Sequence, residues 1–165
     1  MTLESLVTSL LIDGPVCRFG SRGEMRRWLT ALVVAGKKTA TAGLLADYEV
    51  EGEVVPGAGS RSLVVDDDEM VIGVLITVRL EQRRLADVPW EFAEAEGEGF
   101  TGVGHWRSGH EAFWQRESVP LIRQLRDPGF VLDDDTIVVC EWFTFERLTG
   151  PVPWPGPPDL AASGS

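Results

Sequence analysis

The feature that most constrains the fold is an amphipathic helix that ends at a glycine. Its apolar residues recur at the spacing of one helical face and are Met25, Trp28, Leu29, Leu32 and Val33. Ser21 and Glu24 have the spacing of a capping box, which predicts that the helix begins just after Ser21. Gly36 predicts the end of the helix, because glycine readily takes the left-handed conformation that follows one. A helix with one apolar face must pack against another element, so the rest of the chain has to supply that surface.

Strand patterns later in the chain supply this surface. Two β-rich runs, 62–65 and 71–80, flank an acidic turn and predict a hairpin. In residues 136–148 the odd-numbered and the even-numbered positions are both mostly apolar. This pattern predicts a long strand with apolar side chains on both faces. Residues 85–95 and 104–125 have patterns typical of helices. Helices that fall between groups of strands predict a mixed α+β fold with a small, mostly antiparallel sheet.

Length and composition predict one domain of ordinary size. The chain has 165 residues, and we expect a single domain over 1–149. Residues 1–20 carry no clear pattern, and residues 150–165 form a proline-rich segment that we expect to be a disordered tail. No run approaches the length of a membrane span, and Glu4 stands where a signal peptide would be basic. We therefore expect a cytoplasmic protein that does not bind membranes.

The net charge restricts the class of ligand. Fifteen basic and 26 acidic residues give a formal charge of −11. Proteins that bind long nucleic acids neutralise phosphates with Lys and Arg, so this chain repels a polyanion at long range. The charge favours a small, neutral ligand over a long RNA or DNA.

Two short stretches carry chemically active side chains. The stretch 36–43 places an amine, Lys38, three residues before a hydroxyl, Thr41, among small residues. The stretch 92–99 offers carboxylates, including Glu96, among small residues and glycines. An amine, a hydroxyl and a carboxylate are the parts of a nucleophilic or acid–base site.

These stretches carry a resemblance to a known family. The motifs are Gly36-Lys37-Lys38-Thr39-Ala40-Thr41, Pro56-Gly57 before a strand, Phe92-Ala93-Glu94-Ala95-Glu96-Gly97-Glu98-Gly99 and Trp106-Arg107-x-x-His110-x-x-Phe113. In order and spacing the chain resembles the bacterial ASCH domain family over most of its length. The resemblance implies a PUA-like fold, a small β-barrel with flanking helices that is related to RNA-binding domains. Some members of the family hydrolyse N4-acetylcytidine, and another kind cleaves single-stranded RNA.

The resemblance also implies roles for individual residues. The deacetylating members use a Lys, a Thr three positions later and a Glu, which correspond to Lys38, Thr41 and Glu96. In the version that we prefer, Thr41 attacks the acyl carbon, Lys38 is its activating base, and Glu96 passes the proton to the leaving amine. Those enzymes have an arginine two residues after the threonine, whereas this chain has Gly43. The expected substrate-binding residues are Lys37, Thr39, Tyr48, Trp106 and His110.

A structural interpretation of the same residues stays open. Lys38 and Glu96 could form an ion pair at a helix end, with Thr41 as a structural hydroxyl, because many ion pairs have no catalytic role. We expect Glu94 and Glu98 to be surface carboxylates. We expect no metal and no cofactor.

Three functions remain open from the sequence. The first is an amidohydrolase that acts on N4-acylated cytidine or a similar amide. The second is a module that binds or cleaves single-stranded RNA, which requires a basic groove formed by Arg22, Arg26, Arg27, Lys37, Lys38 and Arg107. The third is a sensor that binds a nucleoside without turning it over. The sequence leaves open whether the protein is a monomer or a homodimer.

Overall fold

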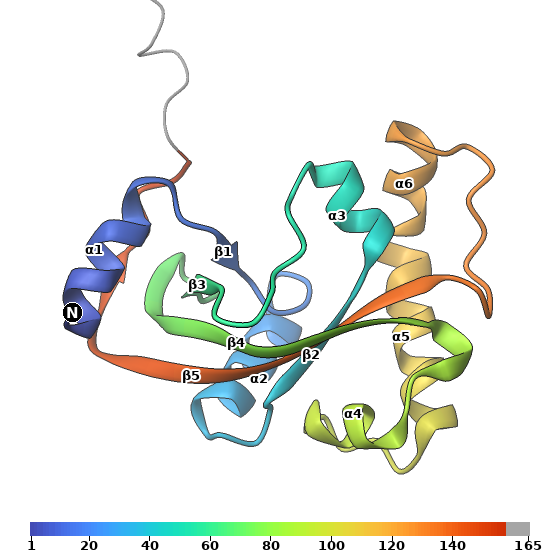
Figure 1. Ribbon diagram of the computed structural model, residues 1–165, viewed down its shortest axis with the longest axis horizontal. Coiled ribbons are helices and arrows are strands. Elements are labelled where there is room, and N and C mark those ends of the chain that lie inside the picture. The colour runs from blue at the N-terminus through green and yellow to red at the C-terminus, as the bar shows by residue number, and fades with distance from the viewer. Residues whose placement is uncertain (158–165) are drawn as a thin grey trace, which may run out of the picture.

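The computed structural model describes residues 1–157 and shows one five-stranded mixed sheet with helices on both sides (Figure 1). The strands are β1 (Val16–Cys17), β2 (Ala40–Leu44), β3 (Arg61–Val65), β4 (Met70–Arg84) and β5 (Ile137–Pro153). The helices are α1 (Leu3–Asp13), α2 (Glu24–Val34), α3 (Leu45–Glu51), α4 (Trp90–Ala95), α5 (Val103–Glu117) and α6 (Val119–Leu125), with a short 3-10 helix at Leu85–Asp87. The predicted α+β class is confirmed.

The sheet is open, so the predicted barrel is not found. The strand order is β1-β3-β4-β5-β2, and β1 and β2 are its two edges. Strands β4 and β5 pair along most of their length and form the curved centre of the sheet. Only β1 runs parallel to its neighbour, so the sheet is mostly antiparallel, as predicted. To close the sheet into a barrel, the edge strands β1 and β2 would have to pair, and β1 is only two residues long.

Helix α2 begins later than its sequence pattern predicts. Its N-cap is Gly23, and no side chain caps it. The capping box predicted at Ser21 is therefore wrong, and the Ser21 hydroxyl instead donates to the sulfur of Met25 at 3.4 Å. Gly36 follows the helix with a φ of 75°, as predicted for the residue after a C-cap. Lys37 and Lys38 therefore lie in the short segment between the end of α2 and the start of β2.

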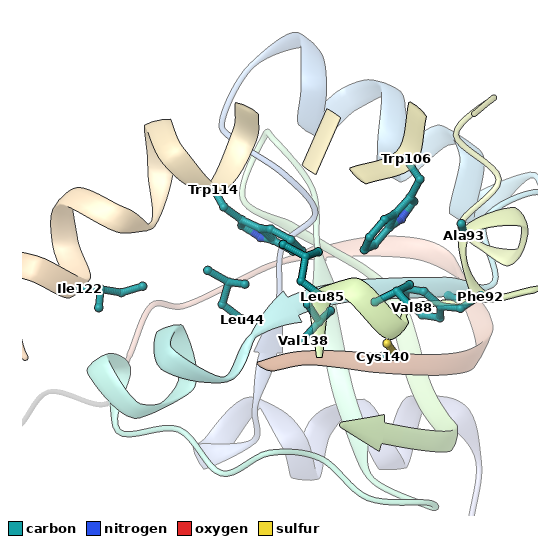
Figure 2. Packing of buried hydrophobic residues seen from close by; sticks show 11 residues of the cluster. Leu44, Leu85, Val88, Phe92, Ala93, Trp106, Trp114, Ile122, Val138 and Cys140 are labelled. Carbon is teal, nitrogen blue, oxygen red and sulfur yellow. The ribbon is translucent and has the colours of Figure 1, made fainter. Parts of the chain in front are cut away.

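Alternating residues of β3 point to opposite faces of the sheet and contact different helices. Leu63 and Val65 pack with α1, whereas Val64 packs with Leu29 and Val33 of α2. A third cluster joins β2 and β5 to α4, α5 and α6, and Figure 2 shows it from close by. Its largest fully buried side chains are Trp106, Trp114 and Phe92. This third cluster holds α4 and α5 against β2, where the candidate site lies.

Both ends of the described chain are more ordered than the sequence pattern suggests. Helix α1 occupies a segment for which we predicted no regular element. Strand β5 extends beyond residue 149, because Val152 and Pro153 pair with Val71 and Met70. The expected tail over 150–165 therefore contributes its first residues to the sheet, and residues 158–165 lie outside the described part. Within the described part, no helix is long and apolar enough to cross a membrane.

Candidate functional site

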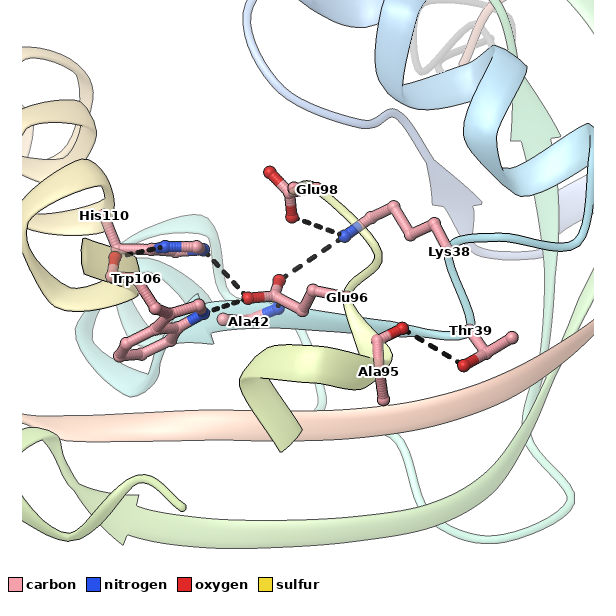
Figure 3. Close-up of polar contacts among 8 residues, drawn as sticks. All are labelled: Lys38, Thr39, Ala42, Ala95, Glu96, Glu98, Trp106 and His110. Carbon is pink, nitrogen blue, oxygen red and sulfur yellow. Dashed lines mark hydrogen bonds and ion pairs between the residues drawn. The ribbon is translucent and has the colours of Figure 1, made fainter. Parts of the chain in front are cut away.

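Three separate elements bring the predicted site residues together (Figure 3). Lys38 lies between the end of α2 and β2, and Glu96 is the C-cap residue of α4. Trp106 and His110 lie one turn apart on α5, so both side chains reach the same side of that helix. The side chains of the other three residues converge on the carboxylate of Glu96.

Glu96 is a buried carboxylate with every oxygen occupied. Its Oε1 accepts from the backbone N–H of Ala42 at 3.1 Å and lies 3.4 Å from Lys38 Nζ. Its Oε2 accepts from the indole N–H of Trp106 and lies 3.1 Å from His110 Nε2. Burial alone would raise the pKa of Glu96, but Lys38, His110 and Trp106 outweigh it and lower the pKa to about 2. Glu96 is therefore ionised at neutral pH and is held by four donors.

Lys38 lies between two carboxylates. Its Nζ is 2.9 Å from Glu98 Oε2 and 3.4 Å from Glu96 Oε1, and its side chain is only 2% exposed. The prediction that Glu98 is a surface carboxylate is wrong, since its side chain is 8% exposed. Burial raises the pKa of Glu98, and the charge of Glu96 adds to this effect, while Lys38 opposes it. The two carboxylates thus differ sharply in how readily they take up a proton.

His110 has hydrogen-bond acceptors at both ring nitrogens. Its Nδ1 lies 3.0 Å from the carbonyl oxygen of Trp106, and its Nε2 faces Glu96. Burial lowers the pKa of His110, but the hydrogen bond and charge of Glu96 outweigh burial, and the net pKa is raised. The imidazole also stacks on the indole of Trp106, with ring centroids 4.3 Å apart. The doubly protonated ring satisfies both acceptors.

Thr41 lies on β2, next to this network. It is half-buried, and its hydroxyl makes no hydrogen bond to another described residue. The next residue, Ala42, donates its N–H to Glu96, so the ion pair lies at the free edge of β2 beside Thr41. Strand β2 itself was not predicted, because its run of small residues has no apolar alternation.

The other expected ligand-binding residues are more dispersed. The Thr39 hydroxyl donates to the carbonyl oxygen of Ala95 at 3.1 Å and so ties β2 to α4. Lys37 is exposed beside it. Tyr48 is half-buried on α3, and its ring covers Gly43 of β2.

Sequence reasoning did not single out a third carboxyl group with little exposure, Glu141 on β5. Glu141 pairs directly with Thr41 across the two strands. It is 7% exposed, and its Oε2 accepts from the Thr77 hydroxyl at 2.5 Å. Burial raises the pKa of Glu141. A signal for this residue was present in the sequence, since a Glu at this point interrupts one of the two apolar sets of the strand.

Three of these side chains have atoms of the type that bind metals. They belong to Glu96, Glu98 and His110, and one such atom of each lies within 4.8 Å of the others. The ammonium group of Lys38 contacts both carboxylates, so a metal cation at this point would have to displace it. These residues therefore fit an ion-paired amine better than a metal ion.

Two surface hollows of about 300 Å³ lie away from this network. One lies between α3 and the segment that leads into β5, and the other lies between α2 and the acidic turn of the β3–β4 hairpin. Neither hollow is lined by Lys38, Thr41 or Glu96. The candidate site is therefore defined by its buried polar contacts rather than by these hollows.

Fold and site together define a small α+β protein in which a buried amine and a buried carboxylate meet at the edge of a sheet. The ASCH domain family matches residues 15–147, and the chain belongs to that family. The resemblance seen in the sequence is thus confirmed.

Solved structures of similar proteins share this fold. A protein of Enterococcus faecalis V583, from the family named DUF984, is 27% identical with a TM-score of 0.73, and the match covers 88% of each chain. An ASCH domain from Lactobacillus crispatus JV V101 is 23% identical with a TM-score of 0.65, over 79% of this chain and 78% of that one, and it supports the fold alone. A search of curated proteins found no match.

Proposed function

We propose that this protein is a hydrolase that cleaves the amide of an N4-acylated cytidine or a chemically similar compound. The observation that carries the proposal is the buried Lys38–Glu96 pair at the edge of β2, where Glu96 accepts from the backbone N–H of Ala42, the residue that follows Thr41. Burying an ion pair is costly and adds little to stability compared with apolar packing, which supports a chemical role for this one. The net charge of −11 supports a neutral nucleoside rather than a polyanion.

In this proposal Thr41 is the nucleophile and Lys38 is its base. A lysine can accept a proton only after it has released one, and Glu98 is 2.9 Å from Nζ with a raised pKa. Lys38 passes a proton to Glu98 and then takes the proton of Thr41 as the Thr41 oxygen bonds to the acyl carbon. The same proton goes to the leaving nitrogen when the C–N bond breaks. Water then hydrolyses the acyl ester, and its proton returns to Thr41.

Glu96 is a positioning residue in this scheme. From the resemblance we expected Glu96 to pass the proton to the leaving amine. With four donors on its two oxygens and a pKa of about 2, it is the carboxylate less suited to accept one. We therefore propose that Glu98 accepts the first proton of Lys38, that Lys38 itself passes the Thr41 proton to the leaving nitrogen, and that Glu96 orients Lys38.

An RNA-binding or RNA-cleaving module receives less support. It requires a groove of free cations, and several of the candidate cations already pair with carboxylates. Arg27 pairs with Asp67, and Arg107 pairs with both Glu111 and Asp134. Ion pairs of this kind reduce the positive charge that is available to phosphates.

The proposal is tested by liquid chromatography of N4-acetylcytidine incubated with the protein. We expect the wild type to release cytidine and Thr41→Val to reduce the rate by about 100-fold or more, because the variant keeps the shape but lacks the nucleophile. Lys38→Met should have a similar effect. Thr144→Val, on the exposed part of β5, is the matched control and should retain activity.

Other outcomes separate the remaining functions. Binding of the nucleoside without turnover would replace the hydrolase with a sensor. If the wild type neither binds nor hydrolyses it, the proposal is wrong, and cleavage of a labelled single-stranded RNA would then support the RNA-directed alternative.

A further inference from the structure

The face of the sheet that carries Thr41 also carries a carboxyl group with no role in the scheme above. Thr41 and Glu141 are directly opposed in the antiparallel β2–β5 pair, so their side chains lie on the same face as close neighbours. Neither the family resemblance nor the proposed proton transfers involve Glu141.

The side chain of Glu141 is mostly buried, but only one of its two carboxyl oxygens has a hydrogen-bond partner in the part of the chain that the structure describes. Its Oε2 accepts from Thr77, while its Oε1 has no hydrogen-bond partner and no cation within ion-pair distance among the described residues and is open to solvent. This oxygen is therefore available to accept a further hydrogen bond, and an incoming ligand can supply the donor.

Tyr48 closes the same face on the side of α3. A side chain at Gly43 would lie on the Thr41 face of β2, and the space that it would fill is taken by Tyr48, whose ring is 3.3 Å from the ideal Cβ position. A side chain at Gly43 would therefore meet the Tyr48 ring. Burial raises the pKa of Tyr48, and the charge of Glu141 adds to this effect.

The amine of Lys38 borders this face as well. Its Nζ lies 5.9 Å from the ring centroid of Phe19, and Phe19 in turn packs on Phe143 at 5.9 Å. Phe143 is two residues after Glu141 and shares its face of β5. The proposed nucleophile, its base and the unmatched carboxyl group therefore lie on one side of the sheet.

We infer that Glu141 accepts a hydrogen bond from the N–H on the exocyclic nitrogen of the ligand's base and so presents the acyl group to Thr41. The inference rests on the proposed function, because it assumes that the ligand lies against Thr41. The ligand class that follows is an uncharged base with an exocyclic N–H, such as an aminopyrimidine nucleoside. A base with an oxygen at that position would face Glu141 with an acceptor and would bind less well.

Binding measured by isothermal titration calorimetry tests the inference independently of turnover. The probes are cytidine and uridine, and the variants are Glu141→Leu and, in case that variant does not fold, Glu141→Gln. We expect the wild type to prefer cytidine, and the variants to bind cytidine at least about tenfold more weakly with a reduced preference over uridine. Glu146→Gln, on the exposed part of β5, is the matched control.

The outcomes distinguish this inference from the proposed function. Unchanged cytidine affinity and preference in a folded Glu141 variant would overturn the inference alone. If the wild type binds neither cytidine nor N4-acetylcytidine, the proposed ligand class is wrong, and the assignment of Glu141 falls with it.

Discussion

At the scale of single residues, Glu96 organises the charges of the site. It sits between Lys38 and His110, and the second carboxylate, Glu98, balances the remaining positive charge. The network thus pairs two cations with two anions in a buried place, where an unpaired charge would be costly.

The pairing of His110 with Glu96 predicts a pH dependence of stability. Because the pKa of His110 is raised in the folded protein, its protonation stabilises the fold. That contribution is fully present below the ordinary pKa of 6.5 and is lost as the pH rises through the folded-state value. Glu96, with a pKa of about 2, stays ionised across this range. We expect the difference in unfolding free energy between wild type and His110→Gln to be larger at about pH 6 than at about pH 9.

Urea denaturation at several pH values measures this difference. His105→Gln is the matched control, because His105 is exposed and contacts no carboxylate among the described residues. A difference between wild type and His110→Gln that does not vary with pH would show that the imidazolium does not stabilise the fold through Glu96.

At the scale of elements, the turn after α4 is fitted to the segment after α2. Gly97 has a φ of +66°, and a side chain there would overlap the carbonyl oxygen of Lys37. This close approach of two backbones brings the carboxylates of both Glu96 and Glu98 to the Lys38 amine, as Figure 3 shows. The position therefore requires glycine both for its conformation and for space.

Comparing Gly97→Ala with Gly99→Ala separates the requirement for a left-handed backbone conformation from the requirement for space. Gly99 has a φ of +85° but has no neighbour near its ideal Cβ position, so Gly99→Ala introduces backbone strain alone. We expect Gly97→Ala to cost about 1–3 kcal/mol more than Gly99→Ala, because it adds overlap with Lys37. Thermal and urea unfolding of both variants measure the two costs, and equal costs would mean that the turn can move away from Lys37.

At the scale of the whole molecule, the two segments outside the family match pack together. The family match ends at residue 147, whereas β5 continues to Pro153. Leu148 and Val152 of this extension join Val7 of α1 in one apolar cluster. Trp154 packs against that cluster and against the Arg18 guanidinium, which lies 4.5 Å from the ring centroid.

Trp154 is therefore expected to stabilise the folded chain. We expect Trp154→Ala to lower the free energy of unfolding by about 1–2 kcal/mol, from lost apolar burial and the lost cation–π contact. Trp28→Ala is the comparison. Trp28 lies on α2 and is 47% exposed, so its replacement should lower the free energy of unfolding by less. Equal losses in urea denaturation would mean that the end of β5 adds little to the fold.

The sequence by itself determined the elements whose patterns are local. The apolar stripe of α2 with Gly36 at its end, the β3–β4 hairpin and the long β5 strand all follow from periodicity within one segment. The motifs also identified the family, and they identified Lys38 and Glu96, which the structure brings into contact.

Only the tertiary structure decided which groups meet and whether the sheet closes. Strand β2 has no apolar alternation of its own and exists because it pairs with β5. The burial of Glu98 and Glu141 depends on contacts with Lys38 and Thr77, each about sixty residues away along the chain. The sheet stays open because β1 is too short to pair with the far edge. Periodicity reports local geometry, whereas contacts between distant segments depend on how the whole chain packs.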